Sequence, residues 1–146
     1  MNLHIIYEDD HILLVNKPSG MLSQKAKDTD ESLVEYIIDY LISSGQLSTE
    51  QLQSFRPSVC NRLDRNTSGL VVAGKSLPGL QIMSAVFKDR SLHKYYRCVV
   101  KGRVTEKQVI TGFLKKDEAT NQVTVTTTET AGSVPIMTEY EPLGWA

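Results

Sequence analysis

The apolar residues of this chain come in short runs, and this feature limits its fold more than any other. No run is longer than the four residues of Ile12–Val15, whereas a membrane-spanning helix needs about 18–20 apolar residues in succession. Short runs rich in β-branched residues and bounded by polar turns are typical of strands. The same pattern predicts strands at 4–7, 12–15, 70–73, 94–100, 109–114, 122–127 and 134–140.

Helical periodicity replaces this pattern in the segment 31–44, where apolar residues recur every three to four positions. Such spacing predicts an amphipathic helix, with Asp30 as its N-terminal cap and Gly45 at its end. The segment 48–51 has the serine-to-glutamine spacing of a capping box and predicts the start of a short second helix.

A third helix is predicted after Ser76, which can cap its first turn, where Pro78 is well tolerated. Helices and strands are thus mixed but segregated along the chain. This arrangement favours an α+β fold with a mixed, largely antiparallel sheet and helices packed beside it. We find no repeat, linker or low-complexity tract, so 1–146 is interpreted as part of one domain.

Charge is distributed unevenly along the chain. The net charge is only −1, but the segment 54–103 contains ten lysines and arginines against two acids, a net charge of +8, and the remainder carries −9. A concentrated basic segment is what a binding site for a polyanion would need, and a solvated basic face is the other explanation. Charge alone does not decide between them. Asp64 is one of the two acids within this positive segment.

The two cysteines, Cys60 and Cys98, do not form a Cys-x-x-Cys pair, and the three histidines are scattered. This spacing does not predict a zinc site and favours unpaired thiols in a reducing compartment. The N-terminus has no basic stretch followed by an apolar one, so no secretory signal is visible. We therefore expect a cytoplasmic protein.

The stretch Asn61–Gly69 holds the strongest motif. Its composition (Asp, Asn, Thr, Ser and Gly) is that of a turn in which short polar side chains bond to nearby backbone groups. Its residue order also resembles the signature of the RluA family of pseudouridine synthases, His-Arg-Leu-Asp-x-x-Thr-Ser-Gly. Every defined position agrees except the first, where Asn61 replaces histidine.

Two further segments resemble the same family in the expected order. The residues 7–9 and 15–20 are similar to its opening strand pair and its Asn-Lys-Pro-x-Gly turn, within which Lys17 is interpreted as structural. The segment 94–102 is similar to its Lys-x-Tyr-x-x-Val-x-Gly strand. The resemblance therefore extends from about Tyr7 to Tyr140.

The resemblance implies an activity: uracil is detached from C1′ of a uridine, rotated, and rejoined through C5, without a cofactor or metal. Asp64 matches the essential carboxylate. A carboxylate with a reference pKa of about 3.9 is ionised at neutral pH, so it could attack C1′ or act as a base there, and the sequence leaves both open. Tyr96 matches the family's active-site tyrosine, which stacks on the base or assists proton transfer at C5; otherwise it is a strand-packing residue.

The basic residues around the motif are the predicted RNA contacts. By resemblance, Arg62 helps to hold or replace the displaced nucleotide, because a uridine in folded RNA must be extruded before its sugar can be reached. Arg65, Lys94 and Arg97 are predicted phosphate contacts, with a solvated face as the alternative. The predicted partner is RNA, with ribosomal RNA favoured over transfer RNA, and no membrane.

The family's later arginine-histidine-glutamine-isoleucine-arginine segment and its N-terminal S4 module are not found in this sequence. We therefore expect the front portion of a catalytic domain, with an incomplete pocket and an apolar surface that promotes self-association. The alternatives are an inactive fragment, a non-catalytic RNA-binding module, and a hydrolase with an aspartate nucleophile. The last would need a second carboxylate nearby, and the basic segment offers only Asp89.

Overall fold

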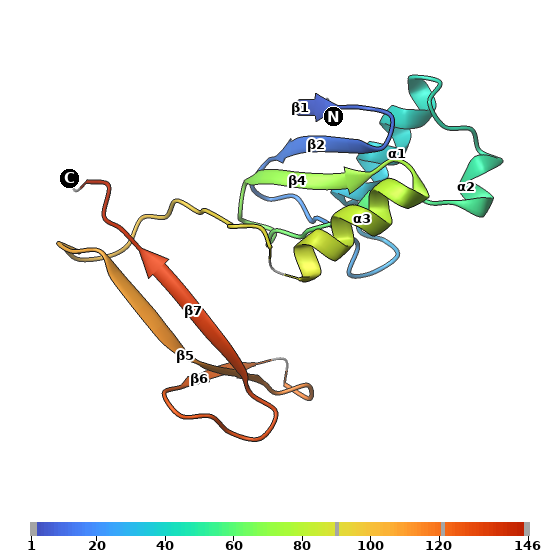
Figure 1. Cartoon of the computed structure of the whole chain (residues 1–146). Helices are drawn as coiled ribbons and strands as arrows, with labels where there is room; N and C mark the ends of the chain where they lie inside the picture. The colour runs from blue at the N-terminus through green and yellow to red at the C-terminus, as the bar shows by residue number, and fades with distance from the viewer. Residues whose placement is uncertain (1–2, 90, 121, 145–146) are drawn as a thin grey trace. The chain divides into compact units, whose positions relative to one another are not determined.

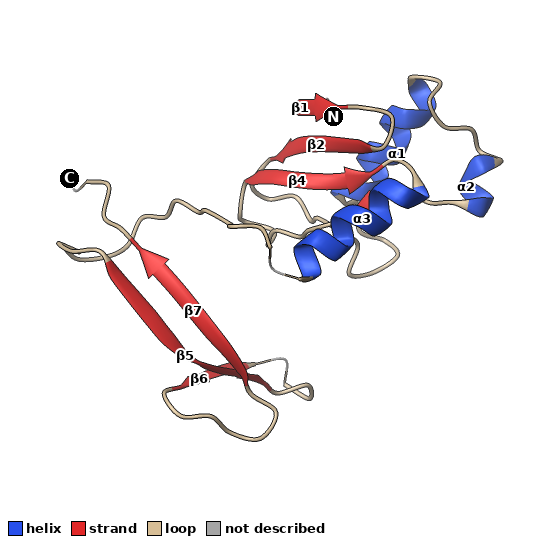
Figure 2. Cartoon of the chain, viewed as in Figure 1, coloured by secondary structure: helices blue, strands red, loops and turns tan. Residues whose placement is uncertain are grey.

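The computed structural model describes residues 3–89, 91–120 and 122–144, and the chain divides into two compact units, Met1–Tyr95 and Tyr96–Ala146. Each unit is described by itself. Figure 1 labels the elements, and Figure 2 colours them by type. The first unit contains β1 (Ile5–Glu8), β2 (Ile12–Lys17), α1 (Leu33–Ser43), α2 (Gln51–Ser54), β3 (Ser58–Val59), β4 (Gly69–Gly74) and α3 (Leu77–Lys88).

The sheet of the first unit has the strand order β1-β2-β4-β3, and its neighbouring strands are all antiparallel. Side chains alternate along β2, so that Leu13, Val15 and Lys17 are buried on one face. Leu13 and Val15 form the core together with the apolar residues of α1 and with Val71 and Ala73 of β4. The helix α1 therefore packs on this face of the sheet.

The helix α3 packs on the other face of β4, the one that carries Gly74. A Cβ atom added at Gly74 would collide with Leu80 of α3, and one added at Gly79 would collide with the backbone carbonyl of His11. Glycine at these two positions lets the helix approach the sheet closely. The first unit is thus a sheet between helices, which confirms the α+β fold expected from the sequence.

The caps of the helices agree with the sequence except at the start of α1. Ser32, not Asp30, precedes α1, and it forms a capping box with Glu35. Asp30 instead accepts hydrogen bonds from the backbone of the preceding loop, at Ala26 and Lys27. Other expectations are confirmed: Gly45 follows α1 with a φ of 73°, Ser48 and Gln51 bond reciprocally, and Ser76 accepts from the backbone N–H of Gly79.

The second unit contains a three-stranded antiparallel sheet of β5 (Gln108–Lys116), β6 (Val123–Thr126) and β7 (Val134–Tyr140), in the order β6-β5-β7. One face of this sheet carries Ile110, Leu114, Val125, Val134 and Ile136, which the strand registers place together. Ile110, Val125 and Val134 are about half exposed.

The strand predicted at 94–100 is wrong. The structure has no strand in this segment, and Val99 is fully exposed. A β-branched run becomes a strand only when a neighbouring strand accepts and donates its backbone hydrogen bonds. No strand of the described residues pairs with it.

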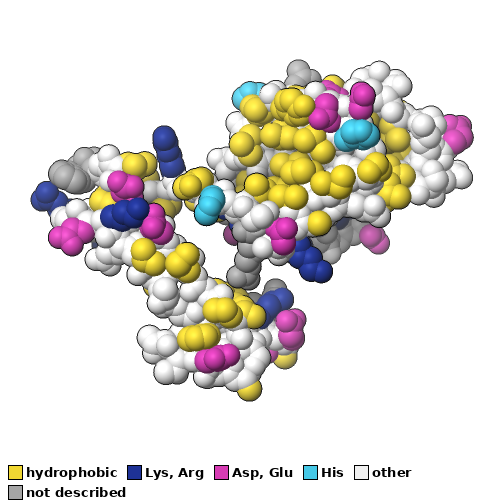
Figure 3. All heavy atoms as spheres, viewed as in Figure 1, with side chains coloured by type: hydrophobic (Ala, Val, Ile, Leu, Met, Phe, Trp, Pro, Cys, Tyr) yellow, Lys and Arg dark blue, Asp and Glu magenta, His cyan; other side chains and the backbone are white. Residues whose placement is uncertain are grey.

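Exposed apolar side chains also gather on the first unit, where Figure 3 shows them over much of the face turned to the viewer. Ile6, Leu70, Leu77 and Ile82 are all at least half exposed. Such patches are typical of surfaces that bind another chain, and self-association stays a prediction.

None of the helices in the described part of the chain has the length and apolar character needed to cross a membrane.

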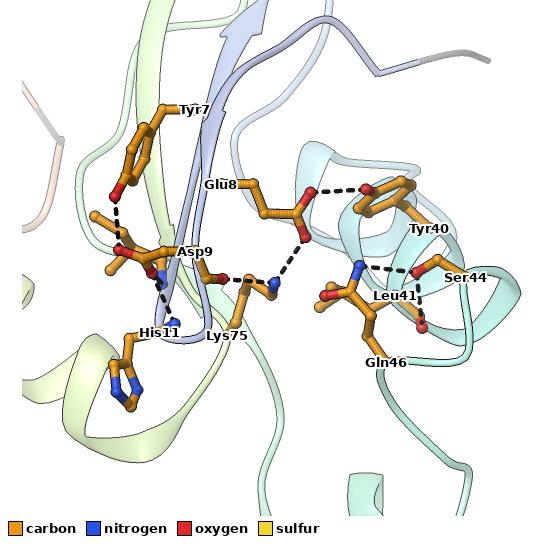
Figure 4. A network of polar contacts seen from close by, with 10 residues as sticks. Tyr7, Glu8, Asp9, His11, Tyr40, Leu41, Ser44, Gln46 and Lys75 are labelled. Atoms are coloured by element: carbon orange, nitrogen blue, oxygen red, sulfur yellow. Dashed lines mark hydrogen bonds and ion pairs between the residues drawn. The ribbon is translucent and has the colours of Figure 1, made fainter.

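A polar network ties the β1–β2 turn to α1 and to the end of β4 (Figure 4). The ammonium of Lys75 donates to the carboxylate of Glu8 at 2.6 Å and to the carbonyl of Asp9 at 2.7 Å, and the hydroxyl of Tyr40 donates to Glu8 at 2.7 Å. Burial raises the pKa of Glu8, but the hydrogen bonds from Lys75, Tyr40 and Gln46 and the charge of Lys75 outweigh it, so the pKa lies below 4.5.

This network predicts a stability effect that depends on pH. A carboxyl group whose pKa is lower in the folded than in the unfolded state stabilises the protein above about pH 4.5, and this contribution is lost as the pH falls through the folded value. Lys75→Met should therefore lower the free energy of unfolding by about 2 kcal/mol at pH 7. The gap to the wild type should narrow as the pH falls from 4.5 through the lower pKa of folded Glu8, as measured by urea unfolding across pH.

The matched control is Lys116→Met, because Lys116 pairs with Glu118 at 3.5 Å where both side chains are exposed. An exposed pair contributes little, so this variant should stay within about 0.5 kcal/mol of the wild type. A stability loss in Lys75→Met that is the same at pH 3 and pH 7 would contradict the assignment to Glu8.

Candidate active site

The motif Asn61–Gly69 forms the loop between β3 and β4. Asn61 fixes its start: the side-chain amide donates to the carbonyl of Leu70 at 3.2 Å, and its oxygen accepts from the N–H of Val72 at 2.8 Å. Both partners lie on β4, so the side chain extends the pairing of the short strand β3. Gly69 ends the loop with a φ of 135°, a conformation that L side chains rarely adopt. The loop therefore leaves and re-enters the sheet at fixed points.

Between these points, the loop backbone is bonded to the segment 17–23, which begins at the last residue of β2. The N–H of Gly20 donates to the carbonyl of Arg65 at 2.8 Å, and the hydroxyl of Ser19 donates to the carbonyl of Asn66 at 2.9 Å. The hydroxyl of Ser23 bonds to both backbone groups of Leu63. The Asn-Lys-Pro turn and the loop 60–68 that carries Asp64, which we call the aspartate loop, are about 45 residues apart in sequence. These contacts join them into one structure.

Lys17 is the buried centre of this arrangement, with no exposed surface. Its ammonium donates to three backbone carbonyls, those of Met21 at 2.8 Å, Pro18 at 3.1 Å and Arg65 at 3.2 Å. Burial lowers the pKa of Lys17, and the negative charge of Asp64 opposes this shift. A positive charge beneath the loop therefore interacts with the carboxylate that the loop presents.

Asp64 itself is exposed at the tip of this anchored loop. Its carbonyl accepts from the N–H of Thr67 at 3.0 Å, which closes a tight turn. Within the described residues, no hydrogen bond or ion pair engages its carboxylate. The side chain is thus open to solvent and mounted on fixed backbone, as a group that reacts with an external substrate must be.

Arg62 and Arg65, which flank Asp64 closely in sequence, are also exposed. Neither forms an ion pair with any residue that the structure describes, whereas Lys25, Arg56 and Lys75 of the same unit all do. The other explanation for an exposed arginine such as Arg62 is an ordinary surface ion pair, and this geometry does not favour it. Both guanidinium groups are available to an anion from outside the chain.

Tyr96 and Arg97 belong to the second unit and Lys94 to the first, and all three lie in an exposed segment without regular structure. Tyr96 is 64% exposed. The site described here is therefore built from residues of the first unit, and the roles of Tyr96, Lys94 and Arg97 stay predictions.

Residues 11–145 match the family model described as RNA pseudouridylate synthase. The chain belongs to this family. The match confirms the resemblance to RluA-type synthases that the sequence motifs indicated, and it extends over both units of the structure.

Individual relatives of this pseudouridylate synthase family member support the same assignment to the family. A ribosomal large subunit pseudouridine synthase D of Zymomonas mobilis is 38% identical over 101 residues, which are 68% of this chain and 31% of that protein. An uncharacterised RNA pseudouridine synthase of Mycoplasma pneumoniae is 33% identical over 96% of this chain and 43% of its own length. The chain spans less than half the length of either relative.

Solved structures show the same fold at low sequence identity. The human RNA pseudouridylate synthase domain containing 4 protein superposes with a TM-score of 0.64 and 13% identity, over 97% of this chain and 54% of that one. At this identity the likeness concerns the fold alone.

The structure adds two residues that the sequence did not single out: Ser19 and Ser23, which hold the aspartate loop. A lone serine carries no local signal for a partner some 40 residues away. The departure from the motif at Asn61 has a function in pairing, because its side chain bonds to Leu70 and Val72 of β4.

Proposed function

We propose that the protein isomerises uridine to pseudouridine in structured RNA, with Asp64 as the essential carboxylate. The observation that carries this proposal is the exposed Asp64 on a loop whose backbone is anchored on both sides of it. Family membership supplies the reaction class. The names of relatives that refer to the ribosomal large subunit make ribosomal RNA the favoured substrate over transfer RNA.

In this reaction the N1–C1′ bond breaks, the base turns, a C5–C1′ bond forms, the C5 proton leaves and N1 gains a proton. The composition of the nucleotide does not change, so no cofactor is required for its balance. A carboxylate can take part at C1′ in two ways, as a nucleophile on the sugar carbon or as a base. Both need an ionised group within reach of the sugar and held in place, which an anchored and exposed loop provides.

Arg62 and Arg65 would bind the RNA around the target nucleotide. A uridine must be unstacked before its C1′ is accessible, which costs a few kcal/mol. A planar guanidinium can stack in the vacated space or bind phosphate with paired hydrogen bonds. Tyr96 is proposed to stack on the target base or to assist proton transfer at C5, with Lys94 and Arg97 as further phosphate contacts.

The direct test uses the protein expressed from its whole reading frame, incubated with ribosomal RNA and, separately, with transfer RNA. Formation of pseudouridine is measured by nucleoside analysis and located by chemical mapping. Conversion in ribosomal RNA is the expected result. Tight RNA binding without conversion would instead favour the non-catalytic binding module.

The two arginines also predict a salt dependence. Each phosphate contact releases counterions, so the logarithm of the binding constant falls with the logarithm of the salt concentration by about 0.7–0.9 per contact. Replacing Arg62 and Arg65 together by methionine should reduce this slope by about 1.4–1.8. The control Lys116→Met, on β5 and paired with Glu118, should leave the slope unchanged. An unchanged slope in the double variant would exclude phosphate contacts for both arginines.

A further inference from the structure

We infer that Ser23 is a positioning residue for Asp64, acting through the backbone of Leu63. This inference rests on the proposed function, because it concerns the placement of the proposed catalytic carboxylate. Ser23 does not belong to the motif around Asp64, and its hydroxyl is 40 residues away from Leu63 in sequence.

The contact is reciprocal, and Ser23 itself is buried. The hydroxyl of Ser23 donates to the carbonyl of Leu63 at 2.7 Å and accepts from its N–H at 3.0 Å, and only 4% of Ser23 is exposed. One side chain thus satisfies both backbone polar groups of the residue immediately before Asp64. Hydrogen bonds shielded from water in this way are strong, and losing one partner leaves a buried group unpaired.

Ser23 is itself fixed to the rest of the fold. The preceding residue, Leu22, pairs with Ser32 in a short parallel bridge, and its carbonyl accepts from the N–H of Leu33 at 2.8 Å. Ser32 and Leu33 form the start of α1, so the position of Ser23 is fixed relative to the N-terminal end of a core helix. A path of direct contacts therefore runs from α1 to the residue that precedes the carboxylate.

The carboxylate depends on this path because no hydrogen bond holds its side chain. No residue in the described part of the chain hydrogen-bonds the side chain of Asp64, so its position is set by its backbone and by the charge of Lys17. On the far side, Arg65 is held by Gly20 and Lys17. Ser23 anchors the backbone on the N-terminal side of Asp64, at Leu63, whose side chain also packs against the core. Freeing this side would let the carboxylate shift, and a displacement of about 1 Å can cost about a hundredfold in rate.

The test measures kcat and KM for pseudouridine formation in the protein expressed from its whole reading frame, with four variants. Ser23→Ala should lower kcat by about 10–100-fold and change KM by less than about threefold. Ser23→Thr, which restores the hydroxyl, should recover most of kcat. Ser44→Ala removes a hydroxyl that donates to the carbonyl of Leu41 outside this loop, and should keep the wild-type kcat.

The remaining variant, Asp64→Asn, separates the two proposals. If it is inactive while Ser23→Ala keeps a wild-type kcat, the positioning role is overturned and the proposed function stands. If Asp64→Asn converts uridine as fast as the wild type, the assignment of the catalytic carboxylate is wrong, and absence of conversion by the wild type would overturn the proposed function itself. A purely structural role would lower the unfolding midpoint of Ser23→Ala but leave the kcat of its folded fraction intact. Should Ser23→Ala not fold, Ser23→Cys, similar in size but weaker in hydrogen bonding, takes its place, and an unchanged kcat overturns the inference.

Discussion

Asp64→Asn should abolish pseudouridine formation, with a loss of at least about 10³-fold in kcat, while RNA binding stays as tight as in the wild type. Asparagine preserves the size of the side chain but has neither a negative charge nor basicity, so it can neither attack C1′ nor remove a proton. The side chain makes no hydrogen bond within the described residues, so the substitution leaves no partner unpaired. Its effect should therefore be confined to the chemistry.

The measurements are nucleoside analysis for conversion and a binding assay at fixed salt for affinity. Asp89→Asn is the matched control, because Asp89 is the other acid of the basic segment and lies at the exposed end of α3. It should convert uridine at the wild-type rate. Undiminished conversion by Asp64→Asn would rule out the assignment of the carboxylate.

Lys17→Met should lower the free energy of unfolding by about 2 kcal/mol. Two effects oppose each other. Because burial keeps the pKa of Lys17 below 10.5, the charged ammonium is a cost to the folded state at neutral pH, and methionine removes that cost. Methionine also leaves the carbonyls of Pro18 and Met21 without their donor, whereas the carbonyl of Arg65 keeps the N–H of Gly20. Two orphaned acceptors, each at about 1–3 kcal/mol when buried, outweigh the gain.

Urea unfolding of the variant measures this loss, and Lys25→Met is its control. Lys25 lies 3.6 Å from Glu35 with about a third of its side chain exposed, so its removal should cost less than about 0.5 kcal/mol. Equal stability of Lys17→Met and the wild type would mean that the ammonium is not what holds the two turns together.

Much of the fold could be predicted because its signals are local. The periodicity of 31–44 and the capping serine at Ser76 specify helices through contacts within a few residues, and α1 and α3 formed where expected. Alternation in 109–114 and 134–140 likewise predicted β5 and β7, whose registers put Ile110, Leu114, Val134 and Ile136 on one face. The position of Asp64 in an exposed loop also follows from the turn-forming residues around it.

What could not be predicted depends on distant partners. Asp30 and Ser32 are both good caps, and the choice of Ser32 depends on Glu35 reaching back to it. The segment 94–100 has the composition of a strand, but composition does not supply a neighbour to pair with. The hydrogen bond between Ser23 and Leu63 joins two segments that are distant in sequence. No pattern in a single sequence predicts that these segments are in contact.

The asparagine at position 61 gives the aspartate loop a property that a histidine there would not. An imidazole gains a proton between about pH 5 and 8 and then has two donors and no acceptor. The amide of Asn61 keeps one donor for Leu70 and one acceptor for Val72 over that whole range. The two hydrogen bonds that attach the loop to β4 therefore do not change between about pH 5 and 8. Any dependence of the reaction rate on pH in this range has to come from other groups.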